Sequence, residues 1–263
     1  FAWARQQGRD RIVGPKGFTA LDGLGLLVKG FEHRPAMGIP YNPPYYEKLV
    51  EDAGFEPLDD DVSGYLSGRA QIPERIHQIA ERVKQRRGLH VPHFTSRRAL
   101  RAIIPRLRDL YNRSLGMNSD QVPLTDGEVK IVADQLLSVA NPRLIKIVMK
   151  GEDPVGFAFA YPDVSAAIQR TRGRVCPFGW IDLLLELKRT RWVNLNGMGI
   201  LPEYQGLGGQ ALLFSEIAKS VSEGRFDHAE IVQVSVNNRK MQLTLRDLGI
   251  DFYKVHRVYQ RAL

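Results

Sequence analysis

The chain has 263 residues, of which 43% are hydrophobic and 25% charged, and its 37 lysines and arginines exceed its 29 acidic residues to give a net charge of +8. This length holds one large domain or two small ones, and the composition is that of an ordinary soluble globular protein. The longest apolar candidates, such as "WIDLLLELK" (180–188), are interrupted by charges and fall short of the roughly 20 apolar residues that span a bilayer. We therefore expect no membrane partner.

Cysteine content and the first residues bear on the compartment. Cys176 is the single cysteine, which excludes an internal disulfide and fits a reducing cytoplasm. The opening "FAWARQQGRD" has neither an initiator methionine nor the apolar core of a signal peptide, so we expect a cytoplasmic chain that is clipped at its front. The positive charge favours anionic partners, either nucleic acid or a phosphate-bearing cofactor, although a solvated basic surface explains it equally well.

Residues 69–88 predict a charged helix that joins two regions. Apolar residues such as Ile79 and Val83 recur at helical spacing, with Pro73 near the start and Gly88 at the end, where helices tolerate these two residue types. We place a domain boundary near residue 88.

The elements expected beyond this helix mix helices and strands, which implies an α+β fold, or layered α/β, around one sheet. In chain order they are a strand at 89–94, a helix at 96–116 bent or broken at Pro105, a helix at 125–140 opened by a capping box of Thr125 and Glu128, a hairpin of strands at 143–150 and 154–162, short helices at 163–171 and 180–190, a strand at 192–201, a helix at 209–223, a strand at 229–236, a helix at 238–249 and a last strand at 252–260.

The stretch "PEYQGLGGQALLF" (202–214) is a glycine-rich turn between a predicted strand and a predicted helix. Glycines allow close approach of a ligand to the backbone, and the unpaired amides of a helix start suit a phosphate or pyrophosphate. The alternative is a tight connection that holds nothing. A P-loop is excluded because no Lys-Ser or Lys-Thr pair follows, and the dinucleotide fingerprint is disfavoured because Ala211 stands where its third glycine belongs.

"GILPEYQGLGGQALL" (199–213) resembles the acyl-CoA signature of the GNAT acyltransferase superfamily, [RQ]-x-x-G-x-[GA] after a strand. Gln205, Gly206, Gly208 and Gly209 fall in register with it, whereas Gln210 replaces its last glycine or alanine. The family also has an asparagine about eleven residues before a second glycine; Asn238 and Gly249 have this separation.

This resemblance covers about two thirds of the chain and implies its domains and fold. Residues 89–263 are similar to an acyl-CoA-binding GNAT domain, 69–88 form the linker helix, and 1–68 resemble part of a second GNAT domain. The implied fold is α+β, with a mixed, mostly antiparallel central sheet flanked by helices, in a tandem arrangement whose first copy is truncated or degenerate. We expect the first copy to be structural or to shape the substrate site.

The resemblance also implies a co-substrate, acetyl-CoA or another acyl-CoA, and an amine acceptor. Backbone amides of the signature strand would bind the pantetheine arm, and those of the turn would bind the pyrophosphate. The implied cofactor-binding residues are Gly199, Ile200, Gln205, Gly206, Leu207, Gly208, Gly209, Gln210, Ala211 and Asn238.

The catalytic residues stay unknown at this stage. Many members carry a tyrosine four residues before the second-motif glycine as the acid for the thiolate, but this chain has Leu245 there. Asn194 and Asn196 in the signature strand can hydrogen-bond a substrate but cannot act as bases. Tyr253 and Tyr259 lie nearby in sequence, although strand tyrosines are more often simply packed. We name no general base.

We therefore expect a CoA-dependent N-acyltransferase that acts by direct transfer, without a metal. One alternative is a catalytically inactive acyl-CoA-binding or interaction module; another is a basic nucleic-acid-binding protein, which we consider unlikely. The basic cluster "RTRGRV" (170–175) falls between the hairpin and the signature strand, where a substrate loop would lie. A homodimer stays an open alternative.

Overall fold

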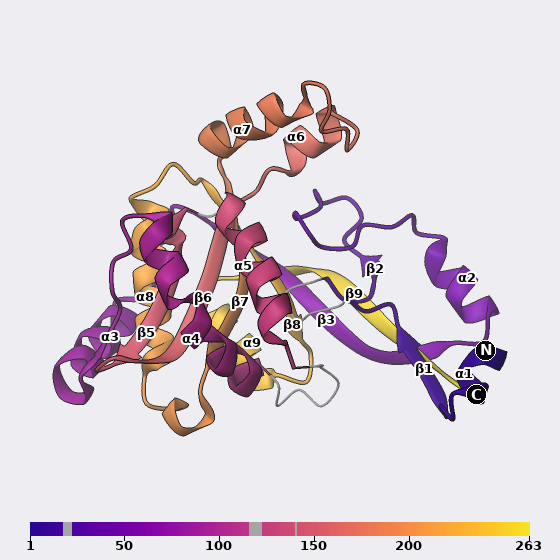
Figure 1. Ribbon diagram of the computed structural model, residues 1–263, viewed down its shortest axis with the longest axis horizontal. Coiled ribbons are helices and arrows are strands. Elements are labelled where there is room, and N and C mark those ends of the chain that lie inside the picture. Colours follow the sequence, from indigo (N-terminus) through magenta and orange to yellow (C-terminus); the bar gives the residue numbers. More distant parts are fainter. Residues whose placement is uncertain (18–22, 116–122, 140) are drawn as a thin grey trace. The chain divides into compact units, whose positions relative to one another are not determined.

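The computed structural model describes residues 1–17, 23–115, 123–139 and 141–263, and it has an α+β fold (Figure 1). Every strand pair whose register is described is antiparallel. Helices flank the strands, as Figure 1 shows. The predicted fold class, a mostly antiparallel mixed sheet flanked by helices, is confirmed.

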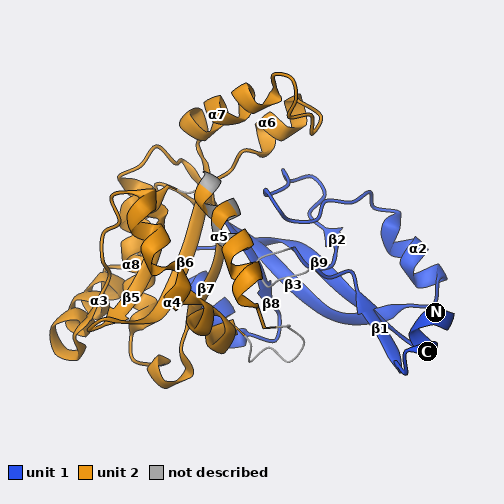
Figure 2. Ribbon diagram, in the orientation of Figure 1, with its two compact units in different colours: residues 1–66, 230–263 blue, residues 67–229 orange. Residues whose placement is uncertain are grey.

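The chain forms two compact units (Figure 2). Unit 1 contains residues 1–66 and 230–263, and unit 2 contains residues 67–229. These boundaries differ from the predicted divisions at 68 and 88, because the last strand, β9 (Asp251–Ala262), pairs with strands from the first 66 residues. The assignment of 1–68 and 89–263 to two family copies stays a prediction.

Unit 2 contains four antiparallel strands in the order β7-β6-β5-β4. The strands are β4 (Leu89–His90), β5 (Ile145–Lys150), β6 (Asp153–Pro162) and β7 (Trp192–Ile200), and the helices are α3 (Glu74–Arg87), α4 (Arg97–Leu115), α5 (Asp126–Val139), η1 (Pro142–Leu144), α6 (Ser165–Arg170), α7 (Gly179–Arg189), η2 (Pro202–Tyr204) and α8 (Gly209–Ser222).

Helices α4 and α8 lie on opposite faces of these strands. A side chain at Gly199 would meet Ser114 of α4, whereas the side chain of its neighbour Ile200 reaches Gly209 of α8. Successive residues of a strand point to opposite faces, so the two helices enclose β7 from both sides. The core between the layers contains fully buried apolar side chains, including Phe157 and Leu212.

Unit 1 is organised around β9, which pairs with β1 and β2 along one edge and with β3 along the other. Its buried interior includes an ion pair, Lys254 Nζ to Glu230 Oε1 at 2.6 Å. The elements are α1 (Ala2–Gln6), β1 (Arg11–Gly14), β2 (Leu26–Lys29), α2 (Tyr46–Asp52), β3 (Glu56–Ser67), β8 (His228–Ser235, whose first two residues belong to unit 2), α9 (Arg239–Asp247) and β9.

Most predicted elements are present, and two details differ. The capping box is confirmed, because the backbone amide of Thr125 donates to Glu128 Oε2 at 2.8 Å. Helix α4 is not broken at Pro105 but continues through it. The strand expected at 89–94 contains only two residues, since Pro92 has no amide hydrogen for a further ladder bond.

The predicted charged helix is α3, which ends at Gly88 in a left-handed conformation. It packs on α8 through polar contacts as well as apolar ones. Lys84 of α3 donates to Glu216 of α8 at 3.0 Å, and His77 Nδ1 lies 2.8 Å from Ser215 Oγ. Burial raises the pKa of Glu216, but hydrogen bonds from Lys84 and Lys219 outweigh it, so the net pKa is below the ordinary value.

We predict that Glu216→Gln lowers the free energy of unfolding near neutral pH by about 1–2 kcal/mol, because the buried partner of two lysines loses its charge. A depressed carboxylate pKa stabilises the fold above the unfolded-state pKa, and this stabilisation is lost as pH falls through the folded-state pKa. The difference between parent and variant in urea unfolding should therefore shrink as pH falls below about 4.3, the ordinary pKa of a glutamate.

Glu223→Gln is the matched control, since Glu223 is exposed just after the same helix. It should leave the unfolding free energy almost unchanged. Equal losses in the two variants, or a pH-independent loss in Glu216→Gln, would contradict the role given to Glu216.

Candidate functional site

The glycine-rich turn connects β7 to α8 within unit 2. Two of its residues, Gly206 (φ +71°) and Gly208 (φ +88°), have left-handed backbone conformations, which side chains with a Cβ disfavour by roughly 1–2 kcal/mol. A Cβ at Gly206 would meet nothing within 4 Å. The backbone at Gly206 is therefore open to an approaching ligand.

Several backbone amides of the turn point at no acceptor. Leu212 N–H donates to Gly208 O at 3.2 Å and closes the first turn of α8, so the preceding amides have no helical partner. Among the described residues, none accepts a hydrogen bond from the amides of Gly206 or of residues 208–211. Gly208 is the N-cap and has no side chain to supply one. This cluster of donors at the positive end of the helix dipole suits an anion.

Neighbouring elements fix the shape of the turn. A Cβ at Gly208 would lie 2.4 Å from Val83 of α3, so this glycine is required both by its backbone conformation and by the close approach of α3. The side chain of Gln205 donates to Ile200 O at 3.3 Å and ties the turn to the end of β7. The predicted glutamine of the signature thus supports the turn from within.

Strand β7 contains a bulge in its middle. Ala158 of β6 pairs with Met198, whereas Ala160 pairs with Leu195, so Asn196 and Gly197 together face one residue of β6. Gly197 has φ +106°, a conformation that few other residues adopt. A bulge bends its strand and takes backbone groups out of the ladder.

The two predicted strand donors point in different directions. Leu201 N–H donates to Val155 O of β6 at 3.0 Å, and bonded pairs alternate along an antiparallel ladder. Gly199 therefore also turns its amide toward β6, whereas the Ile200 amide points away from β6. Of the pair, only the Ile200 amide is not directed at β6; Gly199 instead admits Ser114 of α4.

A buried polar cluster lies where β6 ends and β7 begins, and the sequence did not single it out. Asp163 Oδ2 accepts from Asn194 Nδ2 at 2.8 Å, and its Oδ1 accepts from the Ser165 amide at 2.8 Å. Asp163 and Asn194 are 1% and 0% exposed. Asn194 Oδ1 is a buried acceptor for which no described residue is a donor. The motif Asp-x-Ser after a predicted strand was the available signal, because it favours an Asx turn.

Tyr161 and Asn196 extend this cluster toward the bulge. Asn196 Nδ2 donates to the Tyr161 hydroxyl oxygen at 3.0 Å, and burial raises the pKa of Tyr161 above its ordinary value. Tyr161 lies opposite Asn194 in the ladder. The two asparagines predicted as substrate hydrogen-bonding groups thus share one polar region, with a neutral phenol between them.

The other predicted residues lie in unit 1. Asn238 is the N-cap of α9, and its side-chain oxygen accepts from the Met241 amide at 3.1 Å; its cofactor role stays a prediction. Leu245 is buried in α9. The hydroxyl of Tyr253 donates to Glu230 at 2.5 Å, and that of Tyr259 to Glu47 at 3.0 Å. Both tyrosines are held by carboxylates within their unit.

In the described ranges, no group of three or more histidines, cysteines and acids is arranged to hold a metal ion. The Leu207 amide donates to Tyr204 O at 3.4 Å within the turn. Gly209 and Gln210 are the first two residues of α8, and the cofactor roles of these three residues stay predictions. Ala211 is buried in its first turn.

Comparison with known proteins identifies the fold. No family model matches the chain. Solved structures that resemble it include a GCN5-related N-acetyltransferase from Sphaerobacter thermophilus (TM-score 0.53, 12% identity), which matches 99% of this chain; the match spans 64% of that protein. A second such structure is a tandem GNAT protein from the clavulanic acid biosynthesis pathway (TM-score 0.53, 9% identity). The match covers 99% of this chain and 66% of that protein. This chain has the GNAT fold.

Two curated proteins are similar in sequence to this GNAT-fold chain along nearly its whole length. Protein YghO of Escherichia coli K12 is 26% identical over 275 residues, covering 100% of this chain and 68% of the relative. The bacterial ceramide synthase of Caulobacter vibrioides is 28% identical over 275 residues, covering 99% of this chain and 69% of the relative. The resemblance inferred from the glycine turn is thus confirmed at the level of the fold.

We predict that Asp163→Ala destabilises the protein by about 2–3 kcal/mol, because two buried donors lose their acceptor. Asp163→Asn, which keeps one acceptor oxygen, should cost less. Urea unfolding measures both. Asp153→Ala, at the exposed start of β6, serves as the control and should change stability little; a loss in Asp163→Ala no larger than in this control would contradict the buried role of Asp163.

Proposed function

We propose that this protein transfers an acyl group from acyl-CoA directly to an amine acceptor. The observation that carries the proposal is the set of amides at Gly206 and residues 208–211 to which no described residue offers an acceptor, on a GNAT fold. Such donors bind the pyrophosphate of a nucleotide cofactor without any metal or lysine. The open space at Gly206 leaves room for the phosphates.

The strand that precedes the turn supports binding of the rest of the cofactor. We assign the Ile200 amide, which points away from β6, as a donor for the pantetheine arm. The bulge at Asn196 and Gly197 takes backbone groups out of the ladder close to the position where the thioester would follow. A backbone donor there would polarise the thioester carbonyl.

The buried polar cluster supports an amine acceptor. Asn196 is partly exposed, and its side chain can hydrogen-bond an amine. Asn194 is fully buried, and Asp163 fixes the direction of its amide. In the reaction the amine nitrogen attacks the thioester carbon and the C–S bond breaks, so that CoA leaves as the thiolate. The nitrogen then releases one proton through solvent to the thiolate, and the products are an amide and the CoA thiol.

One relative bears on the acyl group. The Caulobacter protein is named a ceramide synthase, and a ceramide is an amide of a fatty acid with a long-chain amino alcohol. We therefore propose a fatty acyl-CoA in preference to acetyl-CoA as donor. The single cysteine favours a reducing, cytoplasmic compartment.

Gly206→Asp tests the cofactor site. Aspartate tolerates a left-handed backbone better than most residues, and its charge would stand among the donors for the phosphates. We expect at least tenfold weaker CoA binding in calorimetry, on the order of the 1.4 kcal/mol that one lost charge-assisted contact contributes. Turnover with acetyl-CoA and palmitoyl-CoA should fall in parallel.

The matched control is Gly151→Asp, in the turn between β5 and β6. Gly151 has φ +57°, and a Cβ there also meets nothing within 4 Å, so the backbone cost is the same away from the site. Equal CoA affinities in the two variants would overturn the proposed site. CoA binding by the parent without turnover on any long-chain or short amine would instead favour the inactive binding module.

A further inference from the structure

Helices α6 and α7 and the loop between them form an arm, residues 165–189, inserted between β6 and β7. Figure 1 shows the arm extending beyond the ends of these two strands. Its loop folds back on α7, because the Trp180 amide donates to Val175 O at 3.0 Å and a Cβ at Gly179 would collide with Arg174 O. The arm is thus a compact element of its own.

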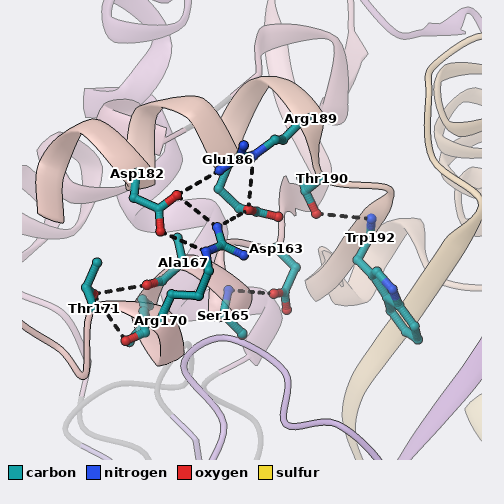
Figure 3. A network of polar contacts seen from close by, with 11 residues as sticks. Asp163, Ser165, Ala167, Arg170, Thr171, Asp182, Glu186, Arg189, Thr190 and Trp192 are labelled. Carbon is teal, nitrogen blue, oxygen red and sulfur yellow. Dashed lines mark hydrogen bonds and ion pairs between the residues drawn. The ribbon is translucent and has the colours of Figure 1, made fainter.

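Ion pairs hold the two helices of the arm together (Figure 3). Arg170 of α6 donates to Asp182 at 2.9 Å and to Glu186 at 2.5 Å, and Arg189 donates to Asp182 at 2.7 Å. Asp182 and Glu186 are the two acids of the arm. Both are therefore already neutralised by arginines on the face of α7 that meets α6.

The other face of α7 is apolar and exposed. Trp180, Ile181, Leu184 and Leu185 recur at the spacing that places side chains on one side of a helix, and their exposed fractions are 49%, 40%, 52% and 48%. Phe178, just before the helix, is 73% exposed. Contiguous apolar surface of this kind on a soluble protein marks an interaction site.

Three cations for which no described residue is an acidic partner accompany this apolar face. Arg172 and Arg174 lie in the loop and Lys188 in the last turn of α7, and within the described part of the chain no acidic group pairs with their side chains. A helix with an apolar face bordered by cations, and with aromatic residues at its start, is typical of elements that lie in the interface of anionic membranes. An uncharged apolar partner would leave these cations without a counterion.

We propose that the arm docks on the surface of an anionic lipid membrane. Phe178, Trp180 and Leu184 enter the acyl-chain boundary, and the three cations contact phosphate headgroups. The Trp180 indole N–H donates to Pro177 O at 2.9 Å, so the ring enters the apolar region with its polar group already bonded. The proposal does not rest on the acyltransferase function.

This proposal departs from the expectation that the protein has no membrane partner. That expectation followed from the lack of a long apolar run, and no described helix is long and apolar enough to cross a bilayer. A helix that lies in the interface needs only one apolar face, so the shorter, interrupted run 180–188 is sufficient.

Binding to vesicles in the absence of acyl-CoA tests the proposal. Cys176, the single cysteine, is exposed in the loop of the arm, so an environment-sensitive fluorophore can be attached there in the native chain. We expect a blue shift and co-sedimentation with vesicles of phosphatidylcholine and phosphatidylglycerol, much weaker binding to phosphatidylcholine alone, and weakening by added salt.

Two variants of the arm should lose this binding. Trp180→Gln/Leu184→Gln removes apolar contact, and the triple replacement Arg172→Gln/Arg174→Gln/Lys188→Gln removes the cations. Each cation near an anionic surface raises the binding affinity roughly fivefold, so the triple variant should bind on the order of 100-fold more weakly. Unchanged circular dichroism and thermal unfolding show that each variant is folded.

Matched controls separate the arm from the general surface. Ile131→Gln/Leu243→Gln replaces two apolar residues that are 60% and 63% exposed outside the arm. Arg97→Gln/Arg98→Gln/Lys130→Gln removes the same charge outside the arm. Both controls should bind as the parent does.

Three results would overturn the proposal: no binding to anionic vesicles, equal binding by arm variants and controls, or insensitivity to lipid charge. Sedimentation velocity then tests whether a second copy of the chain binds the apolar face. Concentration-dependent self-association that Trp180→Gln/Leu184→Gln abolishes, without vesicle binding by the parent, would show that a second copy of the chain covers the apolar face instead.

Discussion

Unit 2 is built around the backbone amides at the start of α8 for which the described part of the chain supplies no acceptor. An unpaired amide is tolerable where water or a ligand can reach it, and the open space at Gly206 provides that access. A side chain at the N-cap could have accepted a hydrogen bond from one of these amides, but Gly208 has no side chain. The turn is kept in this form by α3, whose Val83 leaves no room for a Cβ at Gly208. The charged helix that looked like a linker in the sequence is therefore a support for the turn.

A glycine also permits close packing on the opposite face of β7, where α4 lies. Gly199 admits Ser114 of α4, and Tyr111 of the same helix stacks against Phe157 of β6. Ile200, the proposed ligand donor, and the packing residue Gly199 are neighbours, so under the proposal one strand end serves ligand contact and helix packing with alternate residues. The ion pair network between α3 and α8 holds the third side. Each helix around the turn is thus tied to the strand or helix beside it by a named contact.

Local patterns predicted much of this. The spacing of Thr125 and Glu128 gave the capping box, and the alternation of turns and apolar runs gave the hairpin of β5 and β6. What could not be predicted depends on contacts between residues far apart in the chain. Nothing in the sequence near Asp163 indicates that Asn194 will meet it, since the two are separated by the whole arm. The pairing of β9 with β1, β2 and β3 likewise joins the two ends of the chain, and it moved the boundary between units. Likewise, the sequence does not show that Asp182 and Glu186 of α7 pair with Arg170 of α6, and it is this pairing that leaves the apolar face of α7 on the outside.

The bulge in β7 changes which residues of the strand share a face of the sheet. In β6, Phe157 and Phe159 stack on the face that α4 covers, and Tyr161 follows on the same side. Their partners across the ladder are Gly199, the bulge, and Asn194. Gly199 is an odd-numbered residue and Asn194 an even-numbered one, so they share a face only because the extra residue shifts the count by one. Without the bulge, alternation would send Asn194 to the face of α8, in the place of apolar Val193, and the polar cluster would be split between two sides of the sheet. The one additional residue in the bulge therefore decides on which face of the sheet the polar side chains of the first half of β7 lie.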